Sequence, residues 1–369
     1  MTREPRVQLA PLAGTLRPWL MLLIVCAGFS LHPRFLNTFW TADNLPNILQ
    51  QAATTIILAV GMTFVIITGG IDLSVGSVMA LCGVTLGLTV KQGPPPFLAG
   101  IMAIPAAVGA AALAVRLTGR RAAAWAASGT ALVAAGLAIS RAAAGGIQLE
   151  GAILAALAVG CACGLVNGLL VTLGRVPAFV ATLGMYTAAR GLTVFATDGN
   201  SVSGLPPRLF PVGQGAPLIL TALAAVALGA LVLNRTRSGR HLRAIGGSEE
   251  AARLAGVDVT VHKTLAYVVA GLCSALAAIV LTAKFRVADT GAGTGAELNA
   301  IAAVVIGGTS LSGGRGGVVG SLVGALTIAV LQAGLVLVAV PDTLQGVAIG
   351  GVIIATVMLD QCRRSPAAP

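Results

Sequence analysis

Long apolar runs alternate with short polar segments along almost the whole of this chain. An α-helix needs about 20 predominantly apolar residues to cross the hydrocarbon core of a bilayer. On that criterion the pattern predicts about twelve membrane spans, near Leu16–Leu31, Pro46–Thr68, Val75–Val90, Phe97–Val115, Ala122–Ile139, Gly151–Leu173, Pro177–Thr197, Pro217–Leu233, Thr264–Ala283, Leu298–Leu311, Val318–Val340 and Thr343–Leu359. The predicted fold class is an all-α polytopic membrane protein, a bundle of about twelve transmembrane helices.

One polar segment interrupts this pattern near the middle of the chain, from Asn234 to Lys263. It holds nine charged side chains, whereas only 9% of all residues are charged. Such a segment leaves the bilayer and presents a polar surface. It could be a solvated connector or a docking element for a cytosolic partner, and its length and compactness favour docking.

The second half of this polar segment, Ser248–Val259, predicts a short helix. Ser248 is placed to accept a hydrogen bond from the first free amide groups. Glu249 and Glu250 would complement the positive end of the helix dipole, and Gly256 would close the helix.

Composition supports a membrane protein. Hydrophobic residues make up 56% of the chain, 48 of its 369 residues are glycine, and the mean hydropathy is +0.93, which excludes an ordinary soluble domain. The formal charge of +11 comes from short basic clusters between apolar runs, as the positive-inside rule places them, and not from a nucleic-acid surface. With twelve spans, this bias predicts cytoplasmic N- and C-termini and a polar segment on the cytoplasmic side. Residues Trp19–Phe29 are predicted to be a retained first helix rather than a cleaved signal.

An ionisable side chain, Asp72, stands between two apolar spans within Thr68–Gly76. Two glycines, Gly69 and Gly70, should end the first helix, and either Asp72 or Ser74 could cap the next. The alternative is that a broken helix exposes Asp72 to substrate or to a conformational switch, because charges inside the membrane are costly and often functional. The two roles are compatible.

No catalytic or metal-binding pattern emerges from the sequence. The glycine-rich segments Gly308–Gly316 and Gly291–Gly295 lack the lysine and the strand–turn–helix context of phosphate loops, so turns between helices are predicted. The three histidines, His32, His241 and His262, are far apart in the sequence, and the six cysteines lie mostly in apolar runs. We therefore expect no catalytic residue, no metal and no cofactor on this chain.

Glycine recurs at four-residue spacing, which leaves single helix faces nearly bare. The pairs and triplets are Gly83/Gly87, Gly160/Gly164/Gly168, Gly320/Gly324 and Gly346/Gly350. Such faces let membrane helices approach closely, so they predict tight bundle packing.

Several stretches resemble the permease subunits of bacterial ABC importers. The polar segment carries Glu250-Ala251-Ala252 followed by Gly256, similar to the EAA-type coupling motif that sits in a groove of the ATPase subunit. Three further stretches resemble the ribose/xylose branch of monosaccharide permeases, namely Asn44–Gly83, Asn167–Leu192 and Glu297–Gly314. Together with the coupling motif they are spread over residues 44–314 of the chain.

This resemblance implies a single transmembrane permease domain over residues 1–369, with a core of about ten helices. Residues 94–146 would be an inserted helical hairpin, and residues 234–263 a cytoplasmic loop with the coupling helix. It further implies a cytosolic ABC ATPase that binds ATP and Mg²⁺, an extracytoplasmic sugar-binding protein, and a second permease copy. The implied activity is import of a monosaccharide, such as xylose or ribose, across the bacterial inner membrane.

Residues are assigned to two roles on this basis. Coupling to the ATPase is assigned to Ser248, Glu249, Glu250, Ala251, Ala252, Arg253 and Gly256. Five polar groups set within or beside apolar spans are candidates for the translocation pathway, namely Thr68, Asp72, Ser74, Asn167 and Thr182. Alternatives are import of branched-chain amino acids, nucleosides or a signal sugar, or an ion-coupled secondary transporter, which would be expected to carry more intramembrane acids.

Overall fold

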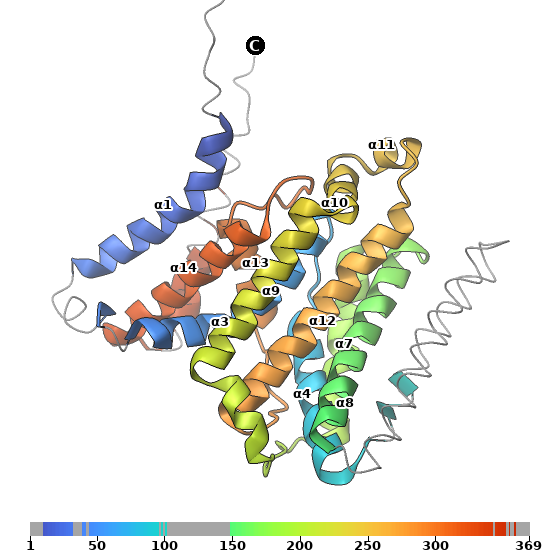
Figure 1. The fold of residues 1–369 in the computed structure, drawn as a ribbon, viewed down its shortest axis with the longest axis vertical. Coiled ribbons are helices and arrows are strands. Elements are labelled where there is room, and N and C mark those ends of the chain that lie inside the picture. Colours follow the sequence, from blue (N-terminus) through green and yellow to red (C-terminus); the bar gives the residue numbers. More distant parts are fainter. Residues whose placement is uncertain are drawn as a thin grey trace, which may run out of the picture.

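The computed structural model describes residues 10–31, 39–41, 44–95, 97–98, 100–101, 148–341, 344–351, 354 and 358. Its helices pack into one bundle (Figure 1). They are α1 (Ala10–Ser30), α3 (Asn44–Ile67), α4 (Val75–Gln92), α7 (Gln148–Thr172), α8 (Ala178–Thr197), the 3-10 helix η1 (Pro207–Gly213), α9 (Gly215–Arg235), α10 (Arg237–Gly247), α11 (Glu249–Leu254), α12 (Val259–Phe285), α13 (Ala296–Ile306) and α14 (Val318–Leu337).

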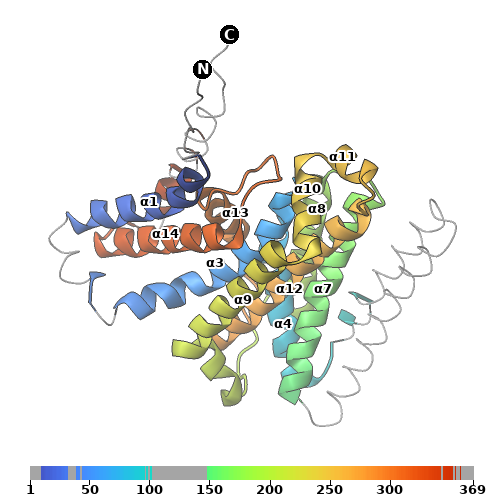
Figure 2. The ribbon, with the colours of Figure 1, turned by 45° about the horizontal axis from the view of Figure 1, so that its top comes forward.

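Seven helical segments in the described part of the chain are long and apolar enough to cross a membrane. They are Asn44–Ile67, Val75–Gln92, Leu149–Thr172, Ala178–Thr197, Gly215–Arg235, Val259–Phe285 and Val318–Leu337. The prediction of a polytopic helical membrane protein is confirmed. In Figure 2, α1 and α14 run side by side on one flank of the bundle, and α7 and α12 run together on the other.

The predicted span Leu298–Leu311 is wrong. The helix there, α13, holds 11 residues, which at 1.5 Å per residue reach only about 16 Å, roughly half the hydrocarbon core. It ends at Ile306 because Gly307 and Gly308 follow, and the amide of Thr309 turns back to the carbonyl of Val304 at 3.1 Å. Apolar composition alone could not distinguish this half-length helix from a full span.

Of the predicted span Thr343–Leu359, the structure describes only residues 344–351, 354 and 358. Two other predicted spans, Phe97–Val115 and Ala122–Ile139, fall largely or wholly outside the described residues. Most of the predicted hairpin at residues 94–146 does so as well. The division of the chain into a permease domain, an inserted hairpin and a cytoplasmic loop therefore stays a prediction.

Glycines bring α7 and α12 into close contact between residues 160 and 168 of α7. A Cβ added to Gly160 would overlap Gly271, one added to Gly164 would overlap Tyr267, and one added to Gly168 would lie 2.7 Å from the Cα of Thr264. The spacing of four residues thus places three successive glycines against backbone of α12, as the sequence predicts.

The other glycine pairs differ in what they face. Gly324 of α14 lies against the backbone of α13 at Ala303, Gly320 lies against Gly307 just after α13, and Gly83 of α4 lies against the hydroxyl of Thr282. By contrast, a Cβ on Gly346 or Gly350 would meet no atom within 4 Å. The close packing predicted from glycine spacing is thus confirmed for Gly320/Gly324 and for Gly83. It is not seen for Gly346/Gly350 in the described chain.

Candidate functional site

The polar segment forms two short helices, α10 and α11, at one end of the bundle, where α9 ends and α12 begins (Figure 1). The predicted capped helix is confirmed as α11. The Ser248 hydroxyl oxygen accepts a hydrogen bond from the Ala251 amide at 3.2 Å, and Gly256 closes the turn with a φ of 81°. A side chain at Gly256 would be strained, because L-residues rarely adopt that φ.

Apolar contacts hold α11 against its neighbours. Ala252 is buried and packs with Ile245 of α10 and Val259 of α12. Ala252 is the buried residue of α11, and the other five residues of this short helix are exposed. The small cluster therefore fixes the orientation of α11 on the end of the bundle.

Charged contacts reinforce this attachment. One oxygen of the Glu249 carboxylate lies 2.8 Å from Nζ of Lys263 on α12, and the other lies 3.1 Å from Arg253. Glu249 was assigned to ATPase coupling, but its side chain points back to the permease. The ion pair with Lys263 therefore positions α11 on the bundle, and the coupling role of Glu249 stays a prediction.

Two histidines that are far apart in the sequence meet beside α11. Nδ1 of His241 on α10 lies 2.9 Å from Nε2 of His262 on α12, and Nδ1 of His262 lies 2.8 Å from the Asp258 carbonyl oxygen. Because a carbonyl only accepts, His262 donates from Nδ1 and accepts at Nε2, and His241 donates. The two histidines are far apart in the sequence, and the fold of the polar segment brings them together by placing α10 against α12.

A pH dependence follows from the ion pair at Glu249. The hydrogen bond from Lys263 lowers the pKa of this carboxyl below its ordinary value of 4.5. The ionised form therefore stabilises the attachment of α11 fully at pH values above the pKa that Glu249 has in the unfolded chain. This contribution is lost as the pH falls through the folded pKa. We expect amide hydrogen exchange in α11, corrected for its intrinsic pH dependence, to be constant from pH 8 to about pH 6 and to accelerate below about pH 4.

The control for this measurement is Glu249→Gln, which keeps the shape of the side chain and removes the charge. Its corrected exchange should be faster than that of the wild type near neutral pH and should show little acid dependence. Equal exchange in the two proteins at pH 7 would contradict the positioning role of Glu249.

The outward face of α11 carries an exposed apolar side chain among charged ones. Leu254 is 84% exposed, and Glu250 and Arg253 are exposed beside it. At the tip of a polar segment, this large apolar side chain is buried neither in the protein core nor in the hydrocarbon of the bilayer. The outward face of α11 therefore presents one apolar and two charged side chains.

The inner end of α10 reaches the break between α3 and α4. Gly246 lies directly against the carbonyl of Ile67, the last residue of α3, and the amide of Gly314 donates to that carbonyl at 2.9 Å. The chain turns at Gly69, which has a φ of 79°. The polar segment therefore touches the start of the Thr68–Gly76 segment that holds Asp72.

Three of the five candidate pathway residues form one buried hydrogen-bonded group. Oδ1 of Asp72 accepts from the Ser74 amide at 2.8 Å and from the Ser74 hydroxyl at 2.6 Å, and Nδ2 of Asn167 on α7 donates to the Ser74 hydroxyl at 2.9 Å. All three side chains are at most 2% exposed. Buried polar groups of this kind are costly unless paired, which explains the network.

The predicted capping role of Asp72 needs correction. Ser74 is the residue that precedes α4, but its side chain makes no capping hydrogen bond, and the Asp72 carboxylate bonds the amide of Ser74 itself. Asp72 therefore closes the turn before α4 and does not satisfy the first free amides inside the helix. The predicted end of α3 at the two glycines is confirmed.

The other two candidates lie at the edges of this group. The Thr182 hydroxyl on α8 lies 3.3 Å from the Ile71 carbonyl and 2.9 Å from the Ala178 carbonyl, whereas Thr68 bonds only locally, to the Val65 carbonyl. Thr182 thus joins α8 to the Asp72 turn. Thr68 belongs to the end of α3 and is not tied into the network.

Sequence reasoning missed Tyr267. Its side chain on α12 is fully buried, its hydroxyl lies against Gly70, and neither that hydroxyl nor Oδ1 of Asn167 has a hydrogen-bond partner in the described part of the chain. An aromatic residue in an apolar run resembles ordinary core, so no sequence signal marked it. Together these groups make a polar centre between α7, α8, α12 and the turn before α4, with unused hydrogen-bonding capacity.

Comparison with known proteins adds a family. The model of a family described as "Branched-chain amino acid transport system / permease component" matches residues 44–150 and 122–357. The ribose import permease protein RbsC of Bacillus subtilis is 38% identical over 369 residues, covering 98% of this chain and 97% of that protein. The Escherichia coli K12 protein of that name is 38% identical over 92% of this chain and 91% of its own length.

A relative named for another sugar is also similar. The xylose transport system permease protein XylH of Haemophilus influenzae is 30% identical over 94% of this chain and 96% of its own length. No solved structure matches this chain.

Proposed function

This chain belongs to the family described as the permease component of the branched-chain amino acid transport system, and from that premise we propose that it is the membrane subunit of an ATP-driven monosaccharide importer. It is a multi-pass protein of the inner membrane. The sugar class rests on its relatives, which are named as ribose and xylose permeases. A pentose is therefore the proposed substrate.

One observation carries the proposal, namely the outward face of α11. It presents Glu250, Arg253 and Leu254 to a partner, while Ala252 and Glu249 attach the helix to α10 and α12. A partner bound to that face would move α10 and α11 together. We assign the coupling role to Glu250, Arg253 and Leu254, with Ser248, Glu249, Ala251, Ala252 and Gly256 shaping and holding the helix.

The contacts of α10 suggest how such a movement reaches the interior. Gly246 lies on the carbonyl that ends α3, and the turn with Asp72 begins five residues after that carbonyl. A shift of α10 would displace this turn and, with it, the network of Asp72, Ser74 and Asn167. We propose that this network, with Thr182 and Tyr267, lines the pathway or its gate and changes its hydrogen bonds between outward and inward access.

The partners proposed with this role are a cytosolic ABC ATPase, an extracytoplasmic sugar-binding protein and a second copy of this permease. Under the proposal, ATP and Mg²⁺ belong to the ATPase, and this chain acts as a transport subunit without its own nucleotide site. The glycine-rich turn at Gly308–Gly316, which lacks a phosphate-binding lysine, packs against α3 and α10 instead.

The test is reconstitution of the permease with its ATPase and binding protein in liposomes. We expect ATP hydrolysis and uptake to be stimulated by D-ribose or D-xylose, and not by leucine or a nucleoside. Stimulation by leucine or a nucleoside alone would replace the sugar assignment. Uptake that persists without the ATPase and collapses with an ionophore would overturn the proposal in favour of an ion-coupled transporter.

A further inference from the structure

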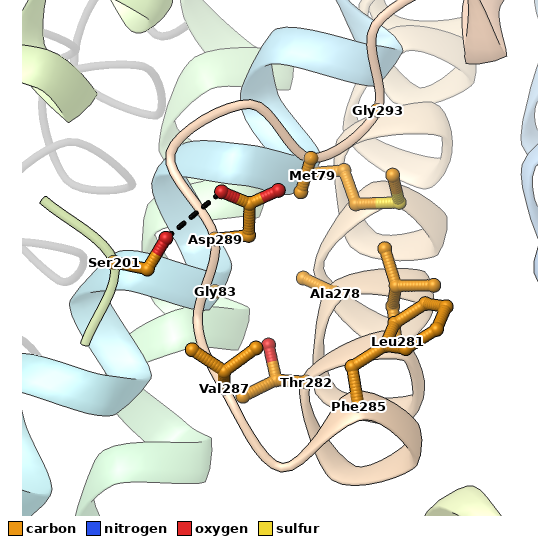
Figure 3. Close-up of a pocket in the computed structure, with 11 residues that line it drawn as sticks. Met79, Gly83, Ser201, Ala278, Leu281, Thr282, Phe285, Val287, Asp289 and Gly293 are labelled. Atoms are coloured by element: carbon orange, nitrogen blue, oxygen red, sulfur yellow. Dashed lines mark hydrogen bonds between the residues drawn. The ribbon is translucent and has the colours of Figure 1, made fainter. Parts of the chain in front are cut away.

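A cavity of about 450 Å³ lies at the far end of α12 from the polar segment. It is bounded by α4, by the last turns of α12 and by the chain that follows α12 (Figure 3). The α12 residues that line the cavity, Ala278 to Phe285, begin 19 residues after the start of the helix at Val259, so this cavity and α11 are separated by roughly 30–40 Å along the helix. Its volume is in the range of small-molecule sites.

Polar groups occupy one wall of the cavity. Oδ1 of Asp289 accepts hydrogen bonds from the Ser201 hydroxyl at 3.0 Å and from the Gly291 amide at 3.2 Å. Both bonds use the same oxygen. The other carboxylate oxygen points away from Ser201 into the space between this loop and α12, and the Thr282 hydroxyl also points into that space (Figure 3).

The opposite wall is apolar. It is formed by Met79 of α4 and by Leu281 and Phe285 of α12. The cavity thus combines a few placed polar groups with an apolar surface, which is the arrangement of ligand sites in general. A monosaccharide has matching chemistry, because its hydroxyl groups ring a body whose faces carry C–H groups.

The polar wall is held in place from behind. Arg190 of α8 donates from Nη1 to the carbonyls of Thr290 and Ala292, at 2.7 and 3.1 Å. An antiparallel bridge joins Val202 to Ala288 through two hydrogen bonds of 2.9 and 3.0 Å. Asp289 and Ser201 are therefore fixed before any ligand arrives, which reduces the entropic cost of binding.

The cavity adjoins the polar centre of the bundle. Gly293, in its wall, lies directly against the backbone of Gly76, which is two residues after Ser74. The cavity is thus joined through Gly293 and Gly76 to the start of α4, beside the Asp72 network. If α11 lies on the cytoplasmic side, the cavity opens at the extracytoplasmic end of the bundle.

We propose that this cavity is the site where the permease first binds the sugar released from outside. Asp289, Ser201 and Thr282 bind its hydroxyl groups, and Leu281 and Phe285 cover its apolar face. The specificity determinant is the Asp289 carboxylate, since an ionised acceptor makes stronger hydrogen bonds to hydroxyl groups than a neutral one. This inference rests on the proposed function and adds a location and a ligand geometry to it.

The variant that tests the site is Asp289→Asn. Asparagine keeps an oxygen for Ser201 and Gly291, so the wall should persist, but it removes the charge and one acceptor facing the cavity. We expect equilibrium binding of tritiated D-ribose or D-xylose to the purified permease–ATPase complex, measured without the binding protein, to weaken about tenfold. Uptake in liposomes should fall in parallel.

Two further variants make the result specific. Asp198→Asn removes a carboxylate from the same end of the bundle, at an exposed position outside the cavity, and should bind sugar like the wild type. Thr282→Val keeps the side-chain shape and removes the hydroxyl, so it should weaken binding severalfold and tests the site even if Asp289→Asn misfolds.

The outcomes separate this inference from the proposed function. ATP-dependent sugar uptake by the wild type with no saturable binding, or with equal binding by the Asp289 and Thr282 variants, would overturn the cavity as the sugar site and leave the importer intact. Absence of any ATP-dependent sugar uptake by the wild type would overturn both.

Discussion

Glu250→Lys should reduce ATP-driven sugar uptake at least tenfold while the permease stays folded in the membrane. The side chain of Glu250 is exposed in the first turn of α11, beside Arg253 and Leu254. Reversing its charge places a cation where the helix dipole favours an anion and opposes whatever basic group the ATPase offers. Like charges across an interface cost several kcal/mol, and about 1.4 kcal/mol is a tenfold loss of affinity.

The measurement is uptake and ATP hydrolysis in liposomes that contain the complete importer. Hydrolysis should lose its stimulation by sugar, and co-purification of the ATPase with the permease should weaken. The matched control is Glu150→Lys, which reverses an exposed acid in the first turn of α7, away from α11. That variant should transport normally.

Unchanged uptake by Glu250→Lys would show that α11 does not transmit the action of the ATPase. A loss of uptake in both lysine variants would indicate a general effect of added charge on the protein or on its insertion. Only a loss confined to Glu250 supports the docking surface on α11.

Gly164→Ala should sharply reduce the yield of folded permease. A Cβ at this position would overlap the carbonyl oxygen of Tyr267 and lie 2.9 Å from the Cα of Val268. Both obstacles are backbone, so no side chain can rotate away, and α7 and α12 must separate along their shared face. Overpacking in a well-packed core typically costs about 1–3 kcal/mol, and here the strain extends to the neighbouring glycine contacts.

The measurement is the monodisperse fraction extracted into mild detergent, together with the midpoint of thermal unfolding. Gly191→Ala is the matched control, because it makes the same substitution in the middle of α8 where a Cβ meets no atom within 4 Å. It should be neutral or slightly stabilising, since glycine weakens a helix relative to alanine. Similar yields for the two variants would contradict the close contact of α7 with α12.

Local chemistry explains why much of this molecule could be predicted from its sequence. The spans α3, α7, α9 and α12 follow from runs of apolar residues, because lipid offers no partner for backbone polar groups and a helix satisfies them internally. The short helix α11 follows from Ser248, the two glutamates and Gly256, which act within one turn. Each of these features depends on residues that are neighbours in the chain.

Features that depend on distant residues needed the tertiary structure. The sequence marked Asp72, Ser74, Asn167 and Thr182 only as polar groups in apolar surroundings, and it gave no reason to join them or to add Tyr267. The short length of α13 was not predicted for a similar reason. Hydropathy measures composition and does not show whether a helix is surrounded by lipid or by protein.

The division therefore follows the range of the interactions. By itself the sequence determined the membrane-embedded helical class, most spans and the exposed capped helix, because hydrophobic length and capping act over a few residues. The tertiary structure alone decided that His241 meets His262, that α10 touches the end of α3, and that Asp289 and Thr282 face one cavity. Those juxtapositions are set by how whole helices pack, and the identity of a residue does not reveal which distant residue will lie beside it.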